Sequence, residues 1–513
     1  MFVKITVVGV RRVAIIGGGV AGLQTARALR AAGLEPVVFE KAARVGGVWC
    51  SNYAGFGIQV PTTLYSFPGF PWGSRAAPGE YASGAKVQSY IEDYVAANAL
   101  APLVRTSTRV DALSPHGGGR QGWSVRSTHD GGGVSTTEEF DFAVIATGLY
   151  SSPAIPSFPG AGAFPGRVVH STAFDDAAVV AASGKRVVVI GGAKSAIDCV
   201  LAASTGGART ATLVYRAPHW GTPQLIAGLI PFQWVFLSRF GQGLVSAFKG
   251  PWPTAPRAVH AAHAALSVVM RPVFAVVEAL FAFQLGQRGP LLPDADVVAD
   301  FYAGAHVLSS EFKAARASGA VTAVRGAVAC LTPRGVALAD GTELEADVVV
   351  CGTGFKREYA FLSLDVRRAL GLDAPGDAPA AAPAAPDGVW LYRSIMPLAV
   401  ANLAFVGSEV ATISNIGTYA LQAEWLARLL TGRLVLPPRA AIDADVAAHK
   451  AWARSWMPAT PARGANVLLH QTHYHDALLK DMNIPHRRKG ANVLAELFAP
   501  YTPQDYDGII EGK

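Results

Sequence analysis

The chain carries near its N-terminus the stretch Arg12-Val13-Ala14-Ile15-Ile16-Gly17-Gly18-Gly19-Val20-Ala21-Gly22, in which an apolar run leads directly into spaced glycines. The pattern is typical of a buried parallel strand that turns into a helix. Gly17 permits the tight turn, Gly19 lets the backbone approach a pyrophosphate, and Gly22 lets the helix pack against the strand. A phosphate would then meet free backbone N–H groups at the positive end of that helix.

The residues that follow distinguish a dinucleotide site from a plain glycine-rich turn. A helix is predicted over 20–32 with Gly33 as its C-cap, and a second strand over 36–39 ends at Glu40. An acid at this position binds the two hydroxyl groups of an adenosine ribose. We therefore predict a Rossmann-like unit that binds a dinucleotide through Gly17, Gly19, Gly22 and Glu40.

A second pair of glycines lies in the loop after this strand. Lys41 comes directly after the acid, and Gly46-Gly47 precedes Trp49. Paired glycines allow another close approach of the backbone to a phosphate or a flavin. Because the loop follows a Rossmann unit, we predict that Lys41, Gly47 and Trp49 complete a flavin dinucleotide site.

The opening pattern returns in the middle of the chain. The apolar run 187–190 leads into Gly191-Gly192-Ala193-Lys194-Ser195-Ala196, and the next predicted strand, 211–215, ends at Arg216 instead of an acid. A carboxylate would repel a 2′-phosphate, whereas a guanidinium binds one. The second site is therefore predicted to bind NADPH through Gly191, Ala193, Lys194, Ser195 and Arg216, and the first to bind FAD. A solvated surface arginine is the alternative for Arg216.

These signals predict an α/β fold with two Rossmann-like dinucleotide-binding domains. The runs that end in Ala146-Thr147-Gly148 and Thr353-Gly354-Phe355 look like strands that close on a cofactor, so Thr147, Gly148, Thr353 and Gly354 join the predicted cofactor-binding residues. We predict a discontinuous FAD domain (1–165 and 325–440), an inserted NADPH domain (166–324) and a C-terminal extension (441–513) that packs on the core. Val348–Phe355 is interpreted as the return to the first domain, and the Ala/Pro-rich tract 374–386 as a surface excursion.

Composition narrows the class of partner and compartment. The formal charge is +7 without dense Lys/Arg runs, so no nucleic acid is predicted. The four cysteines are far apart, which argues against a disulfide framework and a zinc site. His470, His473 and His475 lack a Cys or acid at ligand spacing, so no metal is predicted.

Met1–Val10 is too short for a secretory signal, and we expect a cytoplasmic protein. The sequence leaves the oligomeric state open, a homodimer included.

Residues 218–290 form an apolar insertion with a helical run over 259–283. Arg271, Pro272 and Glu278 interrupt the run, so it lacks the charge-free length of a spanning helix. A helical cap and a surface that rests on a membrane both fit the insertion. We favour the cap, because buried helices are the commoner fate of such segments, and peripheral membrane contact through 218–290 is the alternative.

Between the two glycine patterns lies Phe164-Pro165-Gly166-Arg167-Val168-Val169-His170-Ser171-Thr172-Ala173-Phe174. It resembles the identifying motif F-x-G-x-x-x-H-x-x-x-(Y/F) of the flavin-containing monooxygenases, the class B flavoprotein monooxygenases. The order and spacing of the glycine patterns, the Gly-Gly-x-Trp loop and the two Thr-Gly turns are similar to that family over most of the chain.

The resemblance implies an enzyme similar to N,N-dimethylaniline monooxygenase that binds FAD and NADPH. With O2 it would form a C4a-hydroperoxyflavin that oxygenates a soft nucleophilic atom, N or S, of a small organic substrate. Baeyer-Villiger relatives usually carry Trp where this chain has Phe174, which favours heteroatom oxygenation and leaves ketone oxygenation as an alternative.

A departure from the family concerns the segment near the flavin. The family often has Thr-Asn there, whereas this chain reads Pro61-Thr62-Thr63. Thr62 and Thr63 are the catalytic candidates, and the shorter hydroxyl keeps an uncoupled flavin NADPH oxidase open. His170 is the third catalytic candidate, although a role in placing the cofactors at the domain junction is the favoured interpretation.

Overall fold

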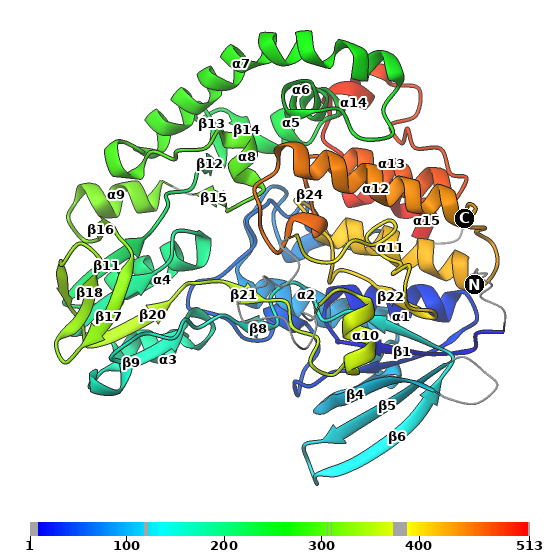
Figure 1. Ribbon diagram of the computed structural model, residues 1–513, viewed down its shortest axis with the longest axis horizontal. Helices are drawn as coiled ribbons and strands as arrows, with labels where there is room; N and C mark the ends of the chain where they lie inside the picture. Colours follow the sequence, from blue (N-terminus) through cyan, green and yellow to red (C-terminus); the bar gives the residue numbers. More distant parts are fainter. Residues whose placement is uncertain (1–8, 117–121, 305, 309, 373–386, 511–513) are drawn as a thin grey trace.

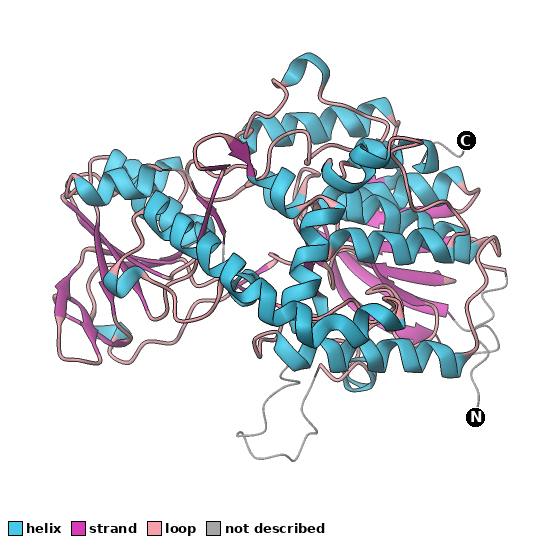
Figure 2. Ribbon diagram, turned by 90° about the horizontal axis from the view of Figure 1, so that it is seen from above, coloured by secondary structure: helices cyan, strands magenta, loops and turns pink. Residues whose placement is uncertain are grey.

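Two parallel sheets organise the chain, each flanked by helices. The computed structural model describes residues 9–116, 122–304, 306–308, 310–372 and 387–510. Figure 2 shows the two groups of strands on opposite sides of the molecule, with helices around each group. The tract 374–386 and residues 1–8 lie outside the described residues.

The first sheet has the strand order β22-β7-β1-β2-β3, and all of its strands are parallel. Its strands are β1 (Arg12–Ile16), β2 (Glu35–Phe39), β3 (Val104–Arg105), β7 (Phe142–Ile145) and β22 (Leu403–Phe405). Val13 and Ile15 face the helices α1 (Val20–Ala31), α2 (Gly84–Ala97) and α11 (Asn415–Leu430). Ala14 and Ile16 face the opposite side, which an antiparallel sheet covers: β4 (Thr108–His116), β5 (Gly122–His129) and β6 (Val134–Phe140).

The second sheet repeats this arrangement with the order β16-β11-β10-β20-β9, again all parallel. Its strands are β9 (Arg167–His170), β10 (Arg186–Ile190), β11 (Thr210–Tyr215), β16 (Thr322–Arg325) and β20 (Val348–Cys351). Val187 and Val189 pack against α4 (Lys194–Thr205), and Val188 faces the other side. That side is covered by β17 (Val328–Thr332), β18 (Gly335–Leu338) and β19 (Glu343–Glu345). The predicted α/β fold with two Rossmann-like units is confirmed.

The sheets correct one predicted boundary. β20 was assigned to the first domain within 325–440, but it pairs with β9 and β10 in the second sheet. A run of valines suits the centre of any parallel sheet, so its composition does not say which sheet it joins. The chain leaves through β8 (Ser152–Pro153) and returns through β21 (Phe355–Lys356), and these two short strands pair with each other between the two sheets (Figure 1).

The insertion folds into short strands and helices above the two sheets. It contains β12 (Gly221–Pro223), β13 (Leu225–Ile226), β14 (Ile230–Pro231), α5 (Phe232–Phe236), α6 (Arg239–Lys249) and α7 (Arg257–Leu285). Phe232, Phe236 and Val245 pack with Val60 and Leu64 of the first domain, so α5 and α6 do form a cap. α7 differs from the expectation of a buried helix: it is continuous over 29 residues, and only 17% of its most apolar window is buried.

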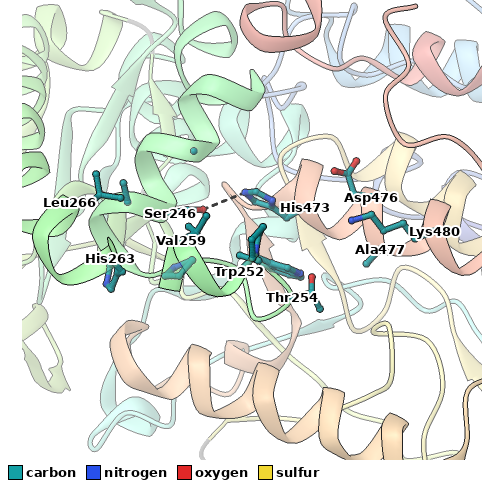
Figure 3. Close-up of a pocket in the computed structure, with 15 residues that line it drawn as sticks. Ser246, Trp252, Thr254, Val259, His263, Leu266, His473, Asp476, Ala477 and Lys480 are labelled. Atoms are coloured by element: carbon teal, nitrogen blue, oxygen red, sulfur yellow. Dashed lines mark hydrogen bonds between the residues drawn. The ribbon is translucent and has the colours of Figure 1, made fainter. Parts of the chain in front are cut away.

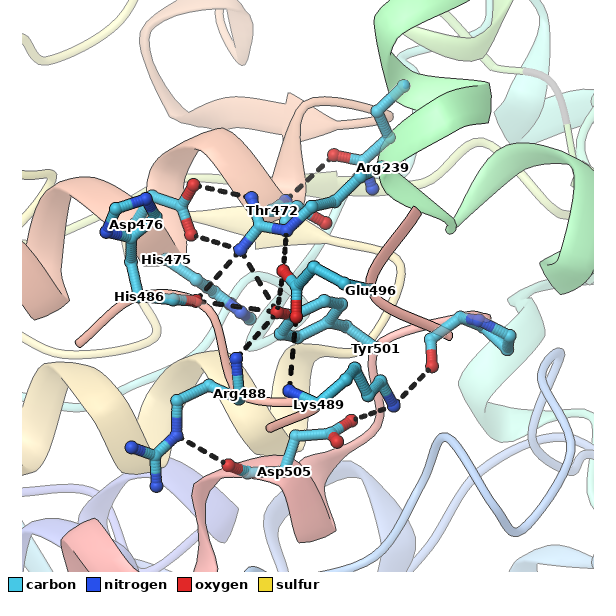
Figure 4. Close-up of polar contacts among 12 residues, drawn as sticks. Arg239, Thr472, His475, Asp476, His486, Arg488, Lys489, Glu496, Tyr501 and Asp505 are labelled. Atoms are coloured by element: carbon cyan, nitrogen blue, oxygen red, sulfur yellow. Dashed lines mark hydrogen bonds and ion pairs between the residues drawn. The ribbon is translucent and has the colours of Figure 1, made fainter. Parts of the chain in front are cut away.

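The C-terminal part packs on α11 and on the insertion. It comprises α12 (Arg439–Trp456), β24 (Asn466–Leu468), α13 (Gln471–Asp481), α14 (Val493–Phe498) and α15 (Asp507–Ile510), with β24 paired to β23 (Ala411–Thr412). Arg239 at the start of α6 is largely buried and donates to Asp476 at 2.6 Å, and it also pairs with Glu496 (Figure 4). Such a buried cation is stable only with its partners, so this network ties the insertion to the C-terminal helices.

The remaining helices and strands are short. They are α3 (Asp176–Ala181), α8 (Val297–Phe301), β15 (His306–Leu308), α9 (Glu311–Ala317) and α10 (Leu364–Ala369).

Candidate functional site

The first glycine turn has the geometry that its sequence predicts. Gly17 directly follows β1 and has φ of 115°, its N–H donates to the Phe39 carbonyl at 2.9 Å, and a Cβ on it would lie 2.5 Å from the Ala146 oxygen. A Cβ on Gly22 would lie 1.9 Å from the Gly17 oxygen. A side chain at either position would collide with fixed backbone, so the turn and the close helix contact both require glycine.

The start of α1 is open toward an anion. Gly19 is its N-cap, no side chain caps the helix, and its first turn has no acid. By contrast, Ser83 and Ser238 cap α2 and α6. A Cβ on Gly47 would lie 3.2 Å from the Gly19 Cα, so two bare backbones face each other across this space. Free N–H groups at a positive helix end between two glycine backbones fit a pyrophosphate.

Glu40 lies beside this turn at the end of β2. Its side chain is buried, and its carboxylate accepts the Gly18 N–H at 2.6 Å and the Ala42 N–H at 2.8 Å. These backbone bonds hold the carboxylate at the glycine turn, which is the position predicted for ribose binding. Lys41 next to it is exposed.

The loop after the second glycine pair is held by aromatic contacts. Trp49 donates its indole N–H to the Tyr65 hydroxyl at 2.8 Å and stacks on Phe56. Thr62 is buried, and its hydroxyl donates to the Ala77 carbonyl at 2.9 Å, whereas Thr63 is exposed. The Thr62 hydroxyl is therefore used inside its own loop, and of the two threonines Thr63 has the freer side chain.

His170 lies at the end of β9 and bonds the turn that follows β20. It is buried, its Nδ1 accepts the Thr172 N–H at 3.3 Å, and its Nε2 lies 2.9 Å from the Gly354 carbonyl. The first contact leaves Nδ1 unprotonated, so Nε2 carries the proton and donates it to Gly354. Burial lowers the pKa of His170, which keeps the ring neutral. A neutral donor that holds a backbone turn is a positioning group.

The two Thr-Gly turns, Thr147-Gly148 and Thr353-Gly354, each follow a parallel strand. Gly148 follows β7 with φ of 72°, and its N–H donates to the Ser408 hydroxyl at 3.3 Å. The Thr353 hydroxyl donates to the Ala154 carbonyl, and Gly354 has φ of 79°. Thr147 directly precedes Gly148. These turns, one after β7 and one after β20, therefore mark the passages between the two domains.

The segment that carries the identifying motif also ties the domains together. Phe174 is buried, and its carbonyl accepts the Ala54 N–H at 2.9 Å. In the same loop, the Tyr53 hydroxyl donates to the Asp198 carboxylate of α4 at 3.0 Å. The loop of the first domain is thus bonded both to the motif and to the first turns of the second glycine helix.

The second glycine turn repeats the first with one difference. Gly191 has φ of 143°, its N–H donates to the Val214 carbonyl at 2.8 Å, and a Cβ on it would lie 2.2 Å from the Gly352 oxygen. α4 begins after Ala193 with no capping side chain and no acid in its first turn. The Lys194 ammonium, however, is bonded to the Asp198 carboxylate. Ser195 in the same turn is half-buried. Lys194 is thus neutralised by its own helix.

Arg216 lies at the end of β11 with an exposed side chain. Within the described ranges it has no carboxylate or hydrogen-bond partner. An exposed guanidinium that no acid neutralises at this strand end fits a 2′-phosphate.

Two histidines and an acid near this strand end were missed by the sequence reasoning. His219 lies 2.8 Å from the Asp300 carboxylate, and its ring lies next to Gly192. His306 is buried, which lowers its pKa to about 4. The two histidines, together with Gly192, Tyr215 and Arg316, border a cavity of about 40 Å³ beside the second glycine turn. The one available signal was the position of His219, three residues after the strand-end Arg216.

A buried acid in the first domain was missed as well. Glu409 follows β22, lies 2.7 Å from the Arg357 guanidinium and accepts the Tyr359 hydroxyl. Burial raises the pKa of this carboxyl group. The available signal was an acid four residues after an apolar strand.

A larger cavity lies apart from both glycine turns. It has a volume of about 270 Å³ and lies between the start of α7 and α13. Figure 3 shows Val259 and Leu266 on one side of it and Asp476 and Lys480 on the other, with Trp252 beside His473 between them. The three tail histidines do not form a metal site, and no group of three or more His, Cys, Asp or Glu in the described ranges could hold a metal ion. His470 and His475 instead contact the hydroxyls of Tyr302 and Tyr506.

Comparison with known proteins agrees with this geometry. Residues 10–251 match the model of the family described as flavin-binding monooxygenase-like. The chain is 29% identical to a probable flavin-containing monooxygenase 1 of Arabidopsis thaliana over 96% of both chains. It is 30% identical to a Baeyer-Villiger monooxygenase of Streptomyces coelicolor over 67% of this chain and 64% of the relative. The crystal structure of OTEMO in complex with FAD and NADP has a similar fold, with a TM-score of 0.64 at 19% identity over 86% of this chain and 90% of that chain.

Proposed function

Because this chain belongs to the flavin-binding monooxygenase-like family, we propose that it uses NADPH and O2 to oxygenate a nitrogen or sulfur atom of a small organic substrate. One oxygen atom of O2 would enter the substrate, and the other would leave as water with the two electrons of NADPH. Membership of this family makes the chain a flavin-dependent monooxygenase.

The two glycine turns suit two different dinucleotides. The uncapped start of α1, the facing backbones of Gly19 and Gly47, and Glu40 would hold the pyrophosphate and ribose of FAD. The uncapped start of α4 and the exposed Arg216 would hold NADPH. When bound, the reduced flavin supplies the activation of O2.

The residues of the chain hold the loops between the two domains in place and shield the site from water. His170, held neutral, fixes the Gly354 turn between the domains, and the Tyr53 hydroxyl fixes the loop of the first domain on α4. The cap helices α5 and α6 cover Val60 and Leu64 near the Thr62 loop and limit the access of water from that side. An acid–base triad is not needed for this chemistry, because the cofactor donates the oxygen atom.

The main observation that favours a heteroatom over a ketone is the extent of the sequence alignment with each relative. The flavin-containing monooxygenase relative aligns over 96% of both chains, whereas the Baeyer-Villiger relative aligns over 64% of its own length. Phe174 in the motif supports the same preference, because it stands where Baeyer-Villiger enzymes usually carry tryptophan. The larger indole would not fit without displacement, since Phe174 is fully buried against α4 and Tyr53.

The test is a panel of a thioether, a tertiary amine and a cyclic ketone. NADPH oxidation, peroxide release and oxygenated product are measured together for each compound. We expect sulfoxide or N-oxide in amounts equal to the NADPH consumed, with little lactone from the ketone. Lactone as the main product would refute the heteroatom proposal and establish the Baeyer-Villiger alternative.

One observation favours a second candidate function, an uncoupled NADPH oxidase. The Thr62 hydroxyl is used by Ala77 and Thr63 is exposed, so neither has a polar group fixed toward a bound flavin by the contacts described. In that case peroxide would equal the NADPH consumed with every compound in the panel. Substitution of Thr63 by asparagine, the residue that the family often has there, would then raise the ratio of product to peroxide.

A further inference from the structure

α7 has a surface that no described part of the chain covers. A single narrow stripe of it packs inward, through Met270, Phe274, Phe281 and Leu285. The opposite side is open and largely apolar: Val268, Val269, Val276 and Phe283 have exposed fractions of 63, 65, 68 and 68%. A helix that is apolar all round is normally buried, so this one requires a partner.

More apolar side chains extend the same surface at the C-terminal end of α7. The β13–β14 hairpin is bonded there, because the Ala227 N–H donates to the Gln284 amide oxygen at 3.1 Å. Leu229, between its strands, is 81% exposed, and Trp234, just after it, is 51% exposed. We call α7 with this hairpin and Trp234 the apolar face; Figure 1 shows α7 as an arch along one outer edge of the molecule.

The charges of the apolar face have one sign. Arg257 begins α7, Arg271 lies near its middle and Arg288 follows its end, and all three are exposed. None of the three has a carboxylate partner in the described part of the chain. Glu278 is the one acid of α7, and it is half-buried and accepts the Val297 N–H at 2.8 Å. The apolar face therefore presents cations to its partner and no free anion of its own helix.

We propose that the apolar face docks the protein onto an anionic phospholipid bilayer, with α7 lying in the interface. Aliphatic side chains with aromatic residues and arginines at the edges are the composition of interfacial helices. The three arginines complement the negative surface of such a bilayer. A second copy of the chain fits less well, because a two-fold contact would bring the same unpaired arginines of both copies together.

The way α7 is attached excludes a spanning orientation in this fold. It has the length and mean hydropathy of a membrane span, but its inward stripe packs on α6 and β12. Its end is also fastened, since the Gln287 amide just beyond the helix donates to the His219 carbonyl at 2.8 Å. A helix held along one side and at its end can insert its outer side to the depth of the acyl boundary but cannot cross.

The cavity of about 270 Å³ lies against the start of α7. Val259 and Leu266 of α7 line it together with Trp252 (Figure 3). The first turns of the helix that forms the apolar face therefore also form one wall of this cavity. The docking proposal does not depend on the reaction that the enzyme catalyses.

The experiment is flotation of the purified holoenzyme with vesicles of phosphatidylcholine and phosphatidylglycerol, compared with vesicles of phosphatidylcholine alone. We expect binding to the anionic vesicles that weakens at high salt. Changing Val268, Val269 and Val276 together to glutamine is expected to weaken binding at least about tenfold. The matched control changes Val134, Val180 and Val435, which are 63, 74 and 86% exposed on other elements, to glutamine and should bind as the wild type does.

A second pair of variants tests the charges. Arg257, Arg271 and Arg288 changed to glutamine should lose about fivefold in vesicle affinity for each arginine, and the salt dependence should disappear. The control changes Arg126, Arg167 and Arg209, which are exposed on the two sheet domains, and removes the same net charge.

Three results would overturn the docking proposal. One is the absence of binding to anionic vesicles, and another is equal loss of binding in the controls and in the apolar-face variants. The third is a dimer in solution that becomes monomeric in the valine variant, which would identify a second copy as the partner. NADPH oxidation in detergent-free buffer should be unchanged in all variants, which shows that they are folded.

Discussion

Substitution of Arg216 by aspartate tests the second nucleotide site with one side chain. The guanidinium is exposed at the end of β11 and unneutralised among the described residues, so a 2′-phosphate would be its charged partner. A charge-assisted contact of this kind contributes about 1.5–3 kcal/mol, and the new carboxylate would repel the phosphate. The apparent affinity for NADPH should therefore fall about tenfold to a hundredfold or more.

The neighbouring lysine should compensate little for this loss. Lys194 is bonded to Asp198, so its charge is already balanced within α4. NADH lacks the phosphate and should be affected slightly, or helped by an acid that can bind its ribose hydroxyls. The control is Arg209→Asp, which makes the same change of charge at the exposed opposite end of β11. Flavin reduction is followed with both nucleotides, and an unchanged NADPH-to-NADH preference in Arg216→Asp would show that Arg216 is a solvated arginine.

Three further predictions concern the fold and its acid stability. Gly22→Ala should yield protein that is unstable and poor in flavin, because the new Cβ would lie 1.9 Å from a backbone oxygen. The control Gly243→Ala in α6, where a Cβ meets open space, should be neutral or stabilising, and both variants are measured by thermal unfolding and by the yellow absorbance. Burial lowers the pKa of His475 to about 3 and that of His306 to about 4. As the pH falls below about 6.5 the unfolded state takes up these protons first, so each buried ring contributes up to about 1.4 kcal/mol per pH unit to the decrease in the free energy of unfolding, and His475→Gln should remove its own share of that slope and leave the rest. Tyr53→Phe removes the hydrogen bond between the first-domain loop and Asp198 and should increase proteolysis at that loop without changing the amount of bound flavin; unchanged cleavage would show that the bond does not restrain the loop.

The two glycine turns could be predicted from sequence because each strand, turn and helix start lies in consecutive residues. The atom that excludes a side chain at Gly22 is the nearby Gly17 oxygen, whereas the atoms that exclude one at Gly17 and Gly191 are the distant Ala146 and Gly352 oxygens. The helix starts could be predicted as well, because the absence of a capping residue can be read from the residues themselves. Local geometry of this kind leaves a pattern in consecutive residues.

The membership of β20 and the environment of Lys194 could not be predicted in this way. A valine run fits either sheet, and only the pairing with β9 and β10 decides between them. Asp198 lies one helical turn after Lys194, but its burial under Tyr53 depends on how the two domains meet. The pairing of Glu409 with Arg357 likewise joins residues from two separate strand ends.

The insertion shows most clearly what the hydrophobic periodicity of a sequence cannot predict. Pro272 and Arg271 in the middle of the apolar run suggested an interruption, yet α7 continues through them. Met270 and Phe274, on either side of the proline, are both buried, and this packing stabilises the helix across the hydrogen bond that proline cannot form. Whether the outer side of such a helix is covered depends on neighbours that the sequence does not specify.

The most direct test of the central claim is anaerobic reduction of the purified yellow protein. If the two glycine turns hold FAD and NADPH as proposed, NADPH alone should bleach the flavin absorbance, with no organic substrate present. Readmission of air should then restore the absorbance. Reduction that strictly requires an organic substrate, or protein that retains no flavin at all, would contradict the account.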